Sequence, residues 1–245
     1  MTFSNILKRY WKNNDFVVKL RTKKRLASLI EELSLNSLFS YREFLVYKRF
    51  HNVQRKEEWL YGRFILKDLI RSHFSMRTAI PLNKIETVTN GKYKPDILLN
   101  GGKLDLDHSL SHSKDLFLAV LSKRRNILIG ADVEYIKDIK PSLLSYFLNK
   151  KEIDEIKELE PDKKRALLFQ YWTIKEATLK TLGIGLQGTI KGILINTIEN
   201  NQASITISIH NLYSAKIREE TNISCYTGIV NNYAIAITKI AISNI

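Results

Sequence analysis

The chain has 245 residues, which is enough for one large domain or two small ones, each with its own hydrophobic core. Hydrophobic residues make up 44% and charged residues 26%, with only 10 glycines and 4 prolines, so the composition excludes disordered and fibrous proteins. The single cysteine, Cys225, cannot form an internal disulfide, and the sequence contains no signal peptide and no apolar run of eighteen residues. We therefore expect a cytoplasmic protein without a membrane partner.

The net charge of +14 is concentrated in the first third of the chain. Residues 1–75 contain 16 Lys or Arg against 7 Asp or Glu. A field of this sign attracts anionic partners, which include nucleic acid, an anionic membrane, a phosphorylated cofactor and an acidic protein. Charge alone leaves these alternatives open, together with a plain solvated basic surface.

The first predicted elements are helical, and strands follow them. Residues 26–38 read as a helix, and residues 47–74 have the apolar spacing of an amphipathic helical region. After turn signals at Asn90-Gly91 and Lys94-Pro95 come three short β-type runs, HSLSHS (108–113), LFLAVLS (116–122) and ILIGADVE (127–134). Because only residues 123–126 separate the last two runs, we expect them to form a hairpin.

A second helical stretch begins after Pro141 and is interrupted near Pro161. The long helix that follows runs from Asp162 to Leu182 and should end at Gly183. Beyond it, β-branched residues gather in three runs that predict strands, at 203–217, 224–230 and 233–242. The order of helices and strands predicts an α+β protein with two halves, residues 1–125 and 126–245.

The run IGADVEYI carries two acids on one face of its predicted strand. Asp132 and Glu134 alternate with apolar neighbours and lie about 7 Å apart, at roughly 3.3 Å per residue. Paired carboxylates repel each other unless a proton or a cation separates them. Magnesium suits a site with few carboxylates plus waters and substrate phosphates. The alternative is an exposed edge with two solvated acids.

The long helix carries a third acid within an apolar stripe. Glu176 shares one helical face with Phe169, Trp172, Leu179 and Gly183. Burying a carboxylate there is costly unless it is paired or bound to a metal, and Lys180 at i+4 offers a simple ion pair as the alternative. With Lys175 beside it, the helix would also place two cations near the carboxylate, which suits a metal with a bound diphosphate.

Three motifs now stand in a fixed order along the chain, SLSHS (109–113), IGADVE (129–134) and WTIKEATLKTLGIGL (172–186). Together they resemble the Sfp-type 4'-phosphopantetheinyl transferases, over roughly residues 41–240. The resemblance implies two similar α+β halves in a pseudo-two-fold arrangement, with the active site in the cleft between them. It also implies a magnesium-dependent enzyme that transfers the phosphopantetheine arm of coenzyme A, its co-substrate, to a serine of an apo acyl- or peptidyl-carrier protein, and releases 3',5'-ADP.

The resemblance also assigns roles to individual residues. Asp132, Glu134 and Glu176 would bind magnesium, and Glu152 would act as base on the carrier serine. From the sequence alone, Glu152 is one acid in a charged helix, and a solvated position is the alternative. The coenzyme A contacts implied by the resemblance are Lys175 and Lys180 at the phosphates and leaving group, Ser111 and His112 at the 3'-phosphate, and Lys48, Arg49, Arg55 and Arg63 at the nucleotide end.

A nucleic-acid-binding module is the competing hypothesis, because the sequence pI is 9.7. It does not account for the three acids, and no known nucleic-acid motif is present in the sequence. The pattern Gly183-Ile-Gly185-Leu-Gln-Gly188 matches G-x-G-x-x-G, but it follows a helix rather than a strand, so dinucleotide binding is not indicated. We expect a monomer with no nucleic-acid partner, and the sequence leaves the identity of the carrier open.

Overall fold

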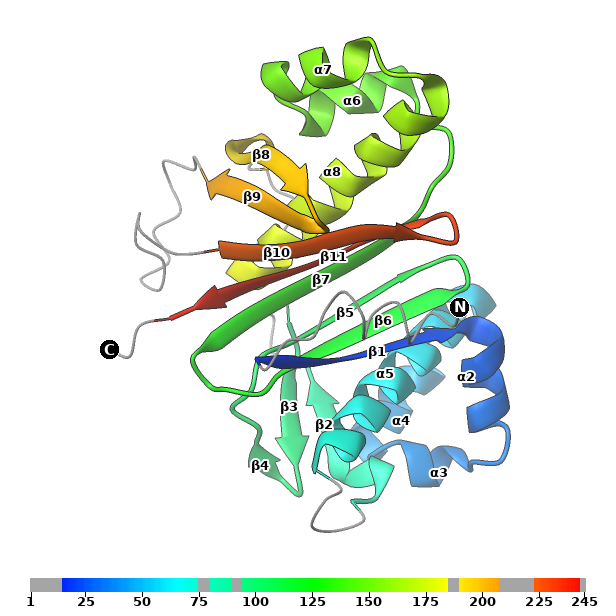
Figure 1. Ribbon diagram of the computed structural model, residues 1–245. Helices are drawn as coiled ribbons and strands as arrows, with labels where there is room; N and C mark the ends of the chain where they lie inside the picture. Colours follow the sequence, from blue (N-terminus) through cyan, green and yellow to red (C-terminus); the bar gives the residue numbers. More distant parts are fainter. Residues whose placement is uncertain (1–14, 75–79, 90–93, 185–189, 208–222, 243–245) are drawn as a thin grey trace. The chain divides into compact units, whose positions relative to one another are not determined.

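The computed structural model describes residues 15–74, 80–89, 94–184, 190–207 and 223–242 (Figure 1). These residues fall into two compact units, with the boundary between Arg125 and Asn126. Each unit combines helices with antiparallel sheet, which confirms the predicted α+β class. Within these ranges, none of the helices has the length and hydropathy that a membrane-spanning segment requires.

The first unit packs its helices against a three-stranded antiparallel sheet of order β1-β6-β5, and it has a second small sheet of order β2-β3-β4. Its longest helix, α5, has 22 residues. The elements are β1 (Phe16–Thr22), α2 (Lys23–Ile30), α3 (Leu35–Leu38), α4 (Tyr41–Lys48), α5 (Val53–Phe74), η1 (Leu82–Lys84), β2 (Ile85–Val88), β3 (Asp96–Leu99), β4 (Gly102–Lys103), β5 (His108–Ser113) and β6 (Leu116–Ser122).

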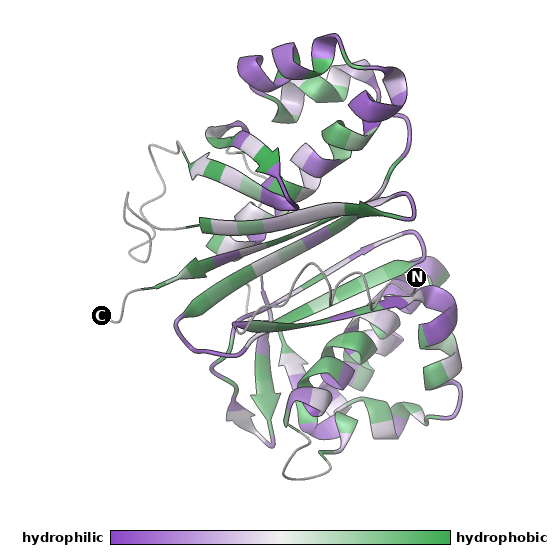
Figure 2. Cartoon of the chain, viewed as in Figure 1, coloured by the Kyte–Doolittle hydropathy of each residue, from purple (hydrophilic) through white to green (hydrophobic). Residues whose placement is uncertain are grey.

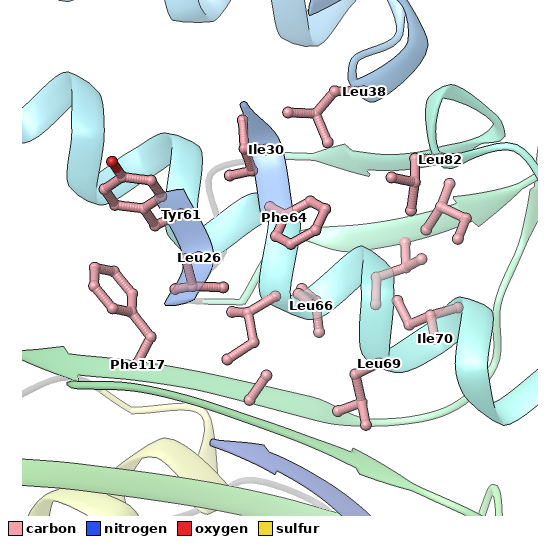
Figure 3. Packing of buried hydrophobic residues seen from close by; sticks show 14 of the residues in the cluster. Leu26, Ile30, Leu38, Tyr61, Phe64, Leu66, Leu69, Ile70, Leu82 and Phe117 are labelled. Carbon is pink, nitrogen blue, oxygen red and sulfur yellow. The ribbon is translucent and has the colours of Figure 1, made fainter. Parts of the chain in front are cut away.

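The core of the first unit forms around α5. Leu66 and Ile70 of this helix are fully buried, and Phe117 of β6 is 1% exposed. Figure 3 shows side chains of α5 among those of the shorter helices, such as Leu26 and Leu38. Burying an aliphatic or aromatic side chain of this size contributes about 1.5–3 kcal/mol, so this cluster is what holds α5 in place.

The second unit has one five-stranded antiparallel sheet of order β7-β11-β10-β9-β8, with the 22-residue helix α8 packed on β7 and β11. Most residues of β7 and β11 are hydrophobic, whereas α7 is mainly hydrophilic (Figure 2). The elements are β7 (Ile127–Tyr135), α6 (Pro141–Phe147), α7 (Lys150–Lys157), α8 (Pro161–Leu182), η2 (Ile190–Gly192), β8 (Ile193–Glu199), β9 (Gln202–Ile207), β10 (Ile223–Val230) and β11 (Tyr233–Ala241).

The ends of α8 follow the sequence signals. Pro161 occupies the first turn, where its missing N–H costs nothing. Gly183 ends the helix in the left-handed region with φ 70°, and its N–H donates to the carbonyl oxygens of Leu179 and Lys180. The long helix therefore has the limits that were predicted, apart from one residue at its start.

Two local predictions are wrong. The expected helix over residues 26–38 is divided into α2 and α3, because Ser34 caps a new helix by accepting the N–H of Ser37. The expected hairpin does not form, since β6 pairs with β1 and β5, whereas β7 pairs with β11. The Asn90-Gly91 turn, Gly185, Gly188 and the end of the strand expected at 203–217 lie outside the described residues.

The two units repeat one order of elements. The series β1, α3, α4, α5, η1, β2, β3, β5 and β6 corresponds to β7, α6, α7, α8, η2, β8, β9, β10 and β11, and both sheets contain the same run of neighbours, β1-β6-β5 and β7-β11-β10. We align Ala119 of β6 with Ala236 of β11, and in these ladders Lys19 of β1 lies opposite Ala119 and Asp132 of β7 lies opposite Ala236. Position 19 of the first unit therefore corresponds to position 132 of the second.

Candidate active site

Gly130 brings helix α8 onto strand β7. A Cβ atom at this position would lie 2.0 Å from the backbone oxygen of Ala177 and 2.5 Å from the backbone nitrogen of Thr181. Only glycine fits such an approach of two backbones. Because side chains alternate along a strand, Asp132 and Glu134 lie on the same face as Gly130, toward the helix. The glycine of the G-x-D-x-E motif thus sets the distance between the acids and α8.

Lys180 of α8 binds the first acid of the strand. Its Nζ donates to Oδ1 of Asp132 at 2.7 Å and to the backbone oxygen of Ala131 at 3.2 Å. Asp132 is 4% exposed, so this ion pair is largely shielded from water. Lys180 therefore pairs with Asp132 across the strand and helix, and it does not form the alternative ion pair with Glu176 on its own helix.

Glu176 lies within the electrostatic reach of both strand acids. Burial, together with the charges of Asp132 and Glu134, raises the pKa of Glu176 to about 7, while Lys180 acts in the opposite direction. Its Oε1 atom is buried and has no hydrogen-bond partner in the described part of the chain. The carboxylate is thus held beside like charges without a compensating donor on this oxygen.

The donor chemistry of this site fits a hard cation. Carboxylate oxygens are the ligands that Mg²⁺ prefers, and a buried oxygen without a donor is open to coordination. Over the described ranges, however, no three His, Cys, Asp or Glu side chains are already gathered closely enough to form a metal site. Lys180 occupies one oxygen of Asp132, so binding a cation requires these side chains to adjust.

The side chains of Glu152 and Lys175 are buried and pair with each other. Both side chains are 0% exposed, and Lys175 Nζ donates to Oε2 of Glu152 at 2.7 Å. A general base must come within hydrogen-bond reach of the proton it removes, and a phosphate ligand must reach the phosphate. The burial contradicts the alternative of a solvated Glu152, whereas the base role of Glu152 and the phosphate contact of Lys175 stay predictions.

The basic residues expected at the nucleotide end lie on α4 and α5 of the first unit and lack acidic partners among the residues described. Lys48, Arg49 and Arg55 are exposed. Arg63 is largely buried, its guanidinium carbon lies 5.2 Å from the centre of the Trp59 ring, and its Nε has no hydrogen-bond partner there. Burial lowers the pKa of Arg63. These four cations therefore remain available to an anion.

The histidines of strand β5 differ in exposure. His112 is exposed and stacks on Phe117 with ring centres 5.2 Å apart, whereas Ser111 beside it is buried. His108 is 6% exposed, and burial lowers the pKa of His108 to about 4, so this side chain is neutral. Of the two histidines of β5, His112 is therefore the one that a ligand can reach from the solvent.

Sequence reasoning missed a second buried pair, in which Lys67 Nζ donates to Glu43 in the first unit. It also missed the ion pair of Lys19 with Asp68. One signal was available. A capping residue and a glutamate three positions later precede a helical lysine in both halves, with Glu43 and Lys67 separated by 24 residues and Glu152 and Lys175 by 23.

Fold and site together define an α+β protein with an acidic strand pressed against a lysine-bearing helix, an arrangement suited to a hard cation and phosphate. The sequence model described as "ACPS: 4'-phosphopantetheinyl transferase superfamily" matches residues 128–238, which include all three acids. Residues 128–238 of the chain are thus similar to this superfamily, and the resemblance to the 4'-phosphopantetheinyl transferases is confirmed.

Named relatives agree with this family. The 4'-phosphopantetheinyl transferase HetI of Nostoc sp. is 27% identical over 140 residues, which cover 56% of this chain and 56% of HetI. The 4'-phosphopantetheinyl transferase gsp of Aneurinibacillus migulanus is 24% identical over 217 residues, 86% of this chain and 85% of gsp. A solved holo-(acyl-carrier-protein) synthase from Bacillus anthracis, in complex with CoA (3',5'-ADP), is 18% identical with a TM-score of 0.39, and the overlap covers 48% of this chain and 98% of that one.

Proposed function

We propose that the protein is a magnesium-dependent, cytoplasmic 4'-phosphopantetheinyl transferase that acts on apo acyl- or peptidyl-carrier proteins. One observation carries the proposal. Glu176, Asp132 and Glu134 share one strand–helix contact, where burial and mutual repulsion raise the pKa of Glu176 to about 7. The match of residues 128–238 to the superfamily and the names of the relatives support the same reaction.

In this reaction the serine oxygen of the carrier forms a bond to the β-phosphorus of coenzyme A. The bond from that phosphorus to the oxygen of the departing 3',5'-ADP breaks, and the proton of the serine hydroxyl passes to water. Asp132, Glu134 and Glu176 would hold Mg²⁺, which neutralises diphosphate charge when it is bound. Lys180 is the cation of this chain nearest to the acids, and its ammonium stabilises negative charge on the leaving group.

The nucleotide end of coenzyme A would be bound by the first unit. Lys48, Arg49 and Arg55 supply exposed cations, and Arg63 supplies a largely buried one beside the Trp59 ring. His112 and Ser111 would meet the 3'-phosphate. The proposal includes a monomeric enzyme.

Mass spectrometry of apo-carrier proteins tests the proposal. A panel of acyl- and peptidyl-carriers is incubated with the protein, coenzyme A and Mg²⁺, and we expect at least one carrier to gain a single phosphopantetheine arm. Glu176→Gln keeps the size of the side chain and removes its charge, so loading should fall by about a hundredfold or more. Failure of the wild-type protein to modify any carrier in the panel would contradict the proposal.

A matched control separates loss of the site from loss of the fold. Asp68→Asn changes the residue that corresponds to Glu176 in the first unit and removes one charge in the same way. We expect loading to persist in Asp68→Asn at a temperature where circular dichroism shows both variants folded. Equal loss of loading in the two variants would mean that the charge of Glu176 has no special role.

A further inference from the structure

Glu152 lies at the centre of a buried hydrogen-bond network in the second unit. Its Oε2 accepts from the backbone N–H of Asn149 at 3.0 Å and from Lys175 Nζ at 2.7 Å, and its Oε1 accepts from the backbone N–H of Ile195 at 3.2 Å. Lys175 Nζ also donates to the backbone oxygen of Phe147 at 2.8 Å. The two side chains thus connect α6, α7 and β8 to α8.

The first unit contains the same network. Glu43 Oε2 accepts from the backbone N–H of Ser40 at 3.1 Å and from Lys67 Nζ at 2.5 Å, and its Oε1 accepts from the backbone N–H of Thr87 at 3.0 Å. Lys67 Nζ also donates to the backbone oxygen of Leu38 at 2.8 Å. These two side chains connect α3, α4 and β2 to α5, which are the corresponding elements.

The positions of the two lysines match along their helices. Lys67 is the fifteenth of the 22 residues of α5, and Lys175 is the fifteenth of the 22 residues of α8. The residue after Lys67 is Asp68, which is bound to Lys19 of β1, whereas Glu176, the residue after Lys175, lies within reach of the charges of Asp132 and Glu134. The network thus recurs in the first unit, where the neighbouring strand β1 is basic. We therefore explain it by the anchoring of a helix and not by chemistry on a substrate.

We propose that Glu152 and Lys175 are positioning residues, which act through Glu176 and do not touch the substrate. The inference rests on the proposed function. Since Glu176 directly follows Lys175, the buried and paired side chains of Glu152 and Lys175 fix the rotation of α8 about its axis and so the place of the Glu176 carboxylate relative to Asp132, whereas an unpaired buried charge would displace the helix. The pair acts on the acid site in the way that outer-shell partners orient metal ligands.

Removing one or both charges of the pair distinguishes positioning from base catalysis. We expect Glu152→Gln and Lys175→Met each to lower kcat for carrier loading by about tenfold or more, because each leaves a buried charge unpaired. The double variant contains no unpaired charge, so most of the lost kcat should return. If Glu152 is the base, the double variant remains as inactive as Glu152→Gln, which would overturn the proposal.

The pH profile adds a second readout of the same question. A positioning role leaves the acidic limb of kcat against pH in place in Glu152→Gln, since the group that titrates is still present. Loss of that limb in Glu152→Gln would identify Glu152 as the titrating base and would overturn the inference. Rescue in the double variant also keeps the test decisive if one of the single variants folds poorly.

Binding of Mn²⁺, followed by electron paramagnetic resonance, requires no transfer reaction. Lys175→Met should weaken Mn²⁺ binding by about tenfold, and the double variant should restore it. The matched controls are Lys67→Met and the double variant Glu43→Gln with Lys67→Met. Both should leave Mn²⁺ affinity unchanged, because Glu43 and Lys67 anchor α5 and not α8. Equal weakening by Lys67→Met and Lys175→Met would overturn the inference.

These measurements separate the two hypotheses. If the wild-type protein modifies no carrier but Mn²⁺ binding follows the expected pattern, the proposed function fails and the positioning role stands. If carriers are modified but Mn²⁺ affinity does not respond to Lys175→Met, the positioning role fails and the function stands. Absence of Mn²⁺ binding by the wild-type protein would overturn the positioning role as well.

Discussion

The two units make the same strand–helix contact with different charges. In the first unit, Lys19 of β1 binds Asp68 of α5 at 2.5 Å, so a cation of the strand meets an anion of the helix. In the second unit the corresponding residues, Asp132 and Glu176, are both acids, and Lys180 binds only the former at 2.7 Å. The first contact thus pairs opposite charges, whereas the second brings like charges together.

This difference shows what the second unit requires from outside. The charges of Asp132 and Glu134 both raise the pKa of Glu176, and Lys180, which binds Asp132, acts in the opposite direction. A divalent cation provides the opposite charge. Where the first unit uses the ammonium of a lysine, the proposed Mg²⁺ would therefore serve the same electrostatic purpose.

We expect the largest effect on stability at Gly130, where strand β7 and helix α8 approach each other most closely. Gly130→Ala places a Cβ atom 2.0 Å from the backbone oxygen of Ala177, whereas the corresponding residue of the first unit, Val17, already has a branched side chain. We expect the free energy of unfolding to fall by about 3 kcal/mol, measured by urea titration. Gly228→Ala is the control, because its nearest contact is 3.5 Å away and a change of less than about 0.5 kcal/mol is expected. Equal, small effects of the two substitutions would disprove the close approach.

Removing one charge from each helix should shift stability in opposite directions. Asp68→Asn leaves Lys19 without its ion-pair partner and should destabilise the protein by about 2 kcal/mol. Glu176→Gln removes a carboxylate whose pKa is raised to about 7, so at pH 8 and without divalent cations it should stabilise by about 1–2 kcal/mol. Urea titrations in EDTA at pH 8 measure both values.

The sign for Glu176 follows from linkage. Its folded pKa lies above its ordinary value, so the stability it contributes is present at low pH and is lost as the pH rises through about 7. The gain from Glu176→Gln should therefore disappear near pH 5. A gain of the same size at pH 5 and pH 8 would show that charge is not the cause.

Local signals in the sequence predicted local structure well. Pro161 and Gly183 define the limits of α8, and the alternation of IGADVE correctly places Asp132 and Glu134 on one strand face. Pairing between distant segments was not predictable in this way. Strands β6 and β7 look like a hairpin, but β7 finds its partner β11 about a hundred residues later, and only the packed sheet decides between these alternatives.

Burial of charged residues was also hidden from the sequence. Glu43 and Glu152 lie in short helices rich in polar residues, where a glutamate is normally solvated. Each is buried because a lysine of a distant helix reaches it, and no local pattern encodes that contact. The likeness of the two halves was expected only from the family resemblance, because it lies in the order of elements and in the buried pairs more than in residue identity.

Corresponding positions of β5 and β10 contain different buried titratable groups. His108 lies opposite Leu121, and Cys225 lies opposite Thr238, which is the same place in the repeated ladder. Burial lowers the pKa of His108 to about 4 and raises the pKa of Cys225 to about 12, so both side chains are neutral. Of these two side chains, only His108 gains a charge when the pH falls.

The folded pKa of His108 lies below its ordinary value of 6.5. The unfolded state therefore binds the proton first, and stability is lost as the pH falls from about 6.5 toward 4. We expect this residue to cost about 2 kcal/mol between pH 7 and pH 5. His108→Phe should reduce the pH dependence of the urea midpoint by that amount, and an unchanged slope would show that His108 is already protonated or exposed.

The capping boxes of α4 and α7 offer the finest comparison. Ser40 accepts the N–H of Glu43 at 3.3 Å, and Asn149 accepts the N–H of Glu152 at 2.9 Å. Serine and asparagine are nearly equal as N-caps, whereas alanine cannot accept the bond. Ser40→Ala and Asn149→Ala should each cost about 1 kcal/mol in urea titrations, while Ser40→Asn and Asn149→Ser should cost only a few tenths. A large cost of the conservative exchanges would mean that each cap is tailored to its own helix, so that the two buried Glu–Lys networks are less alike than their hydrogen bonds indicate.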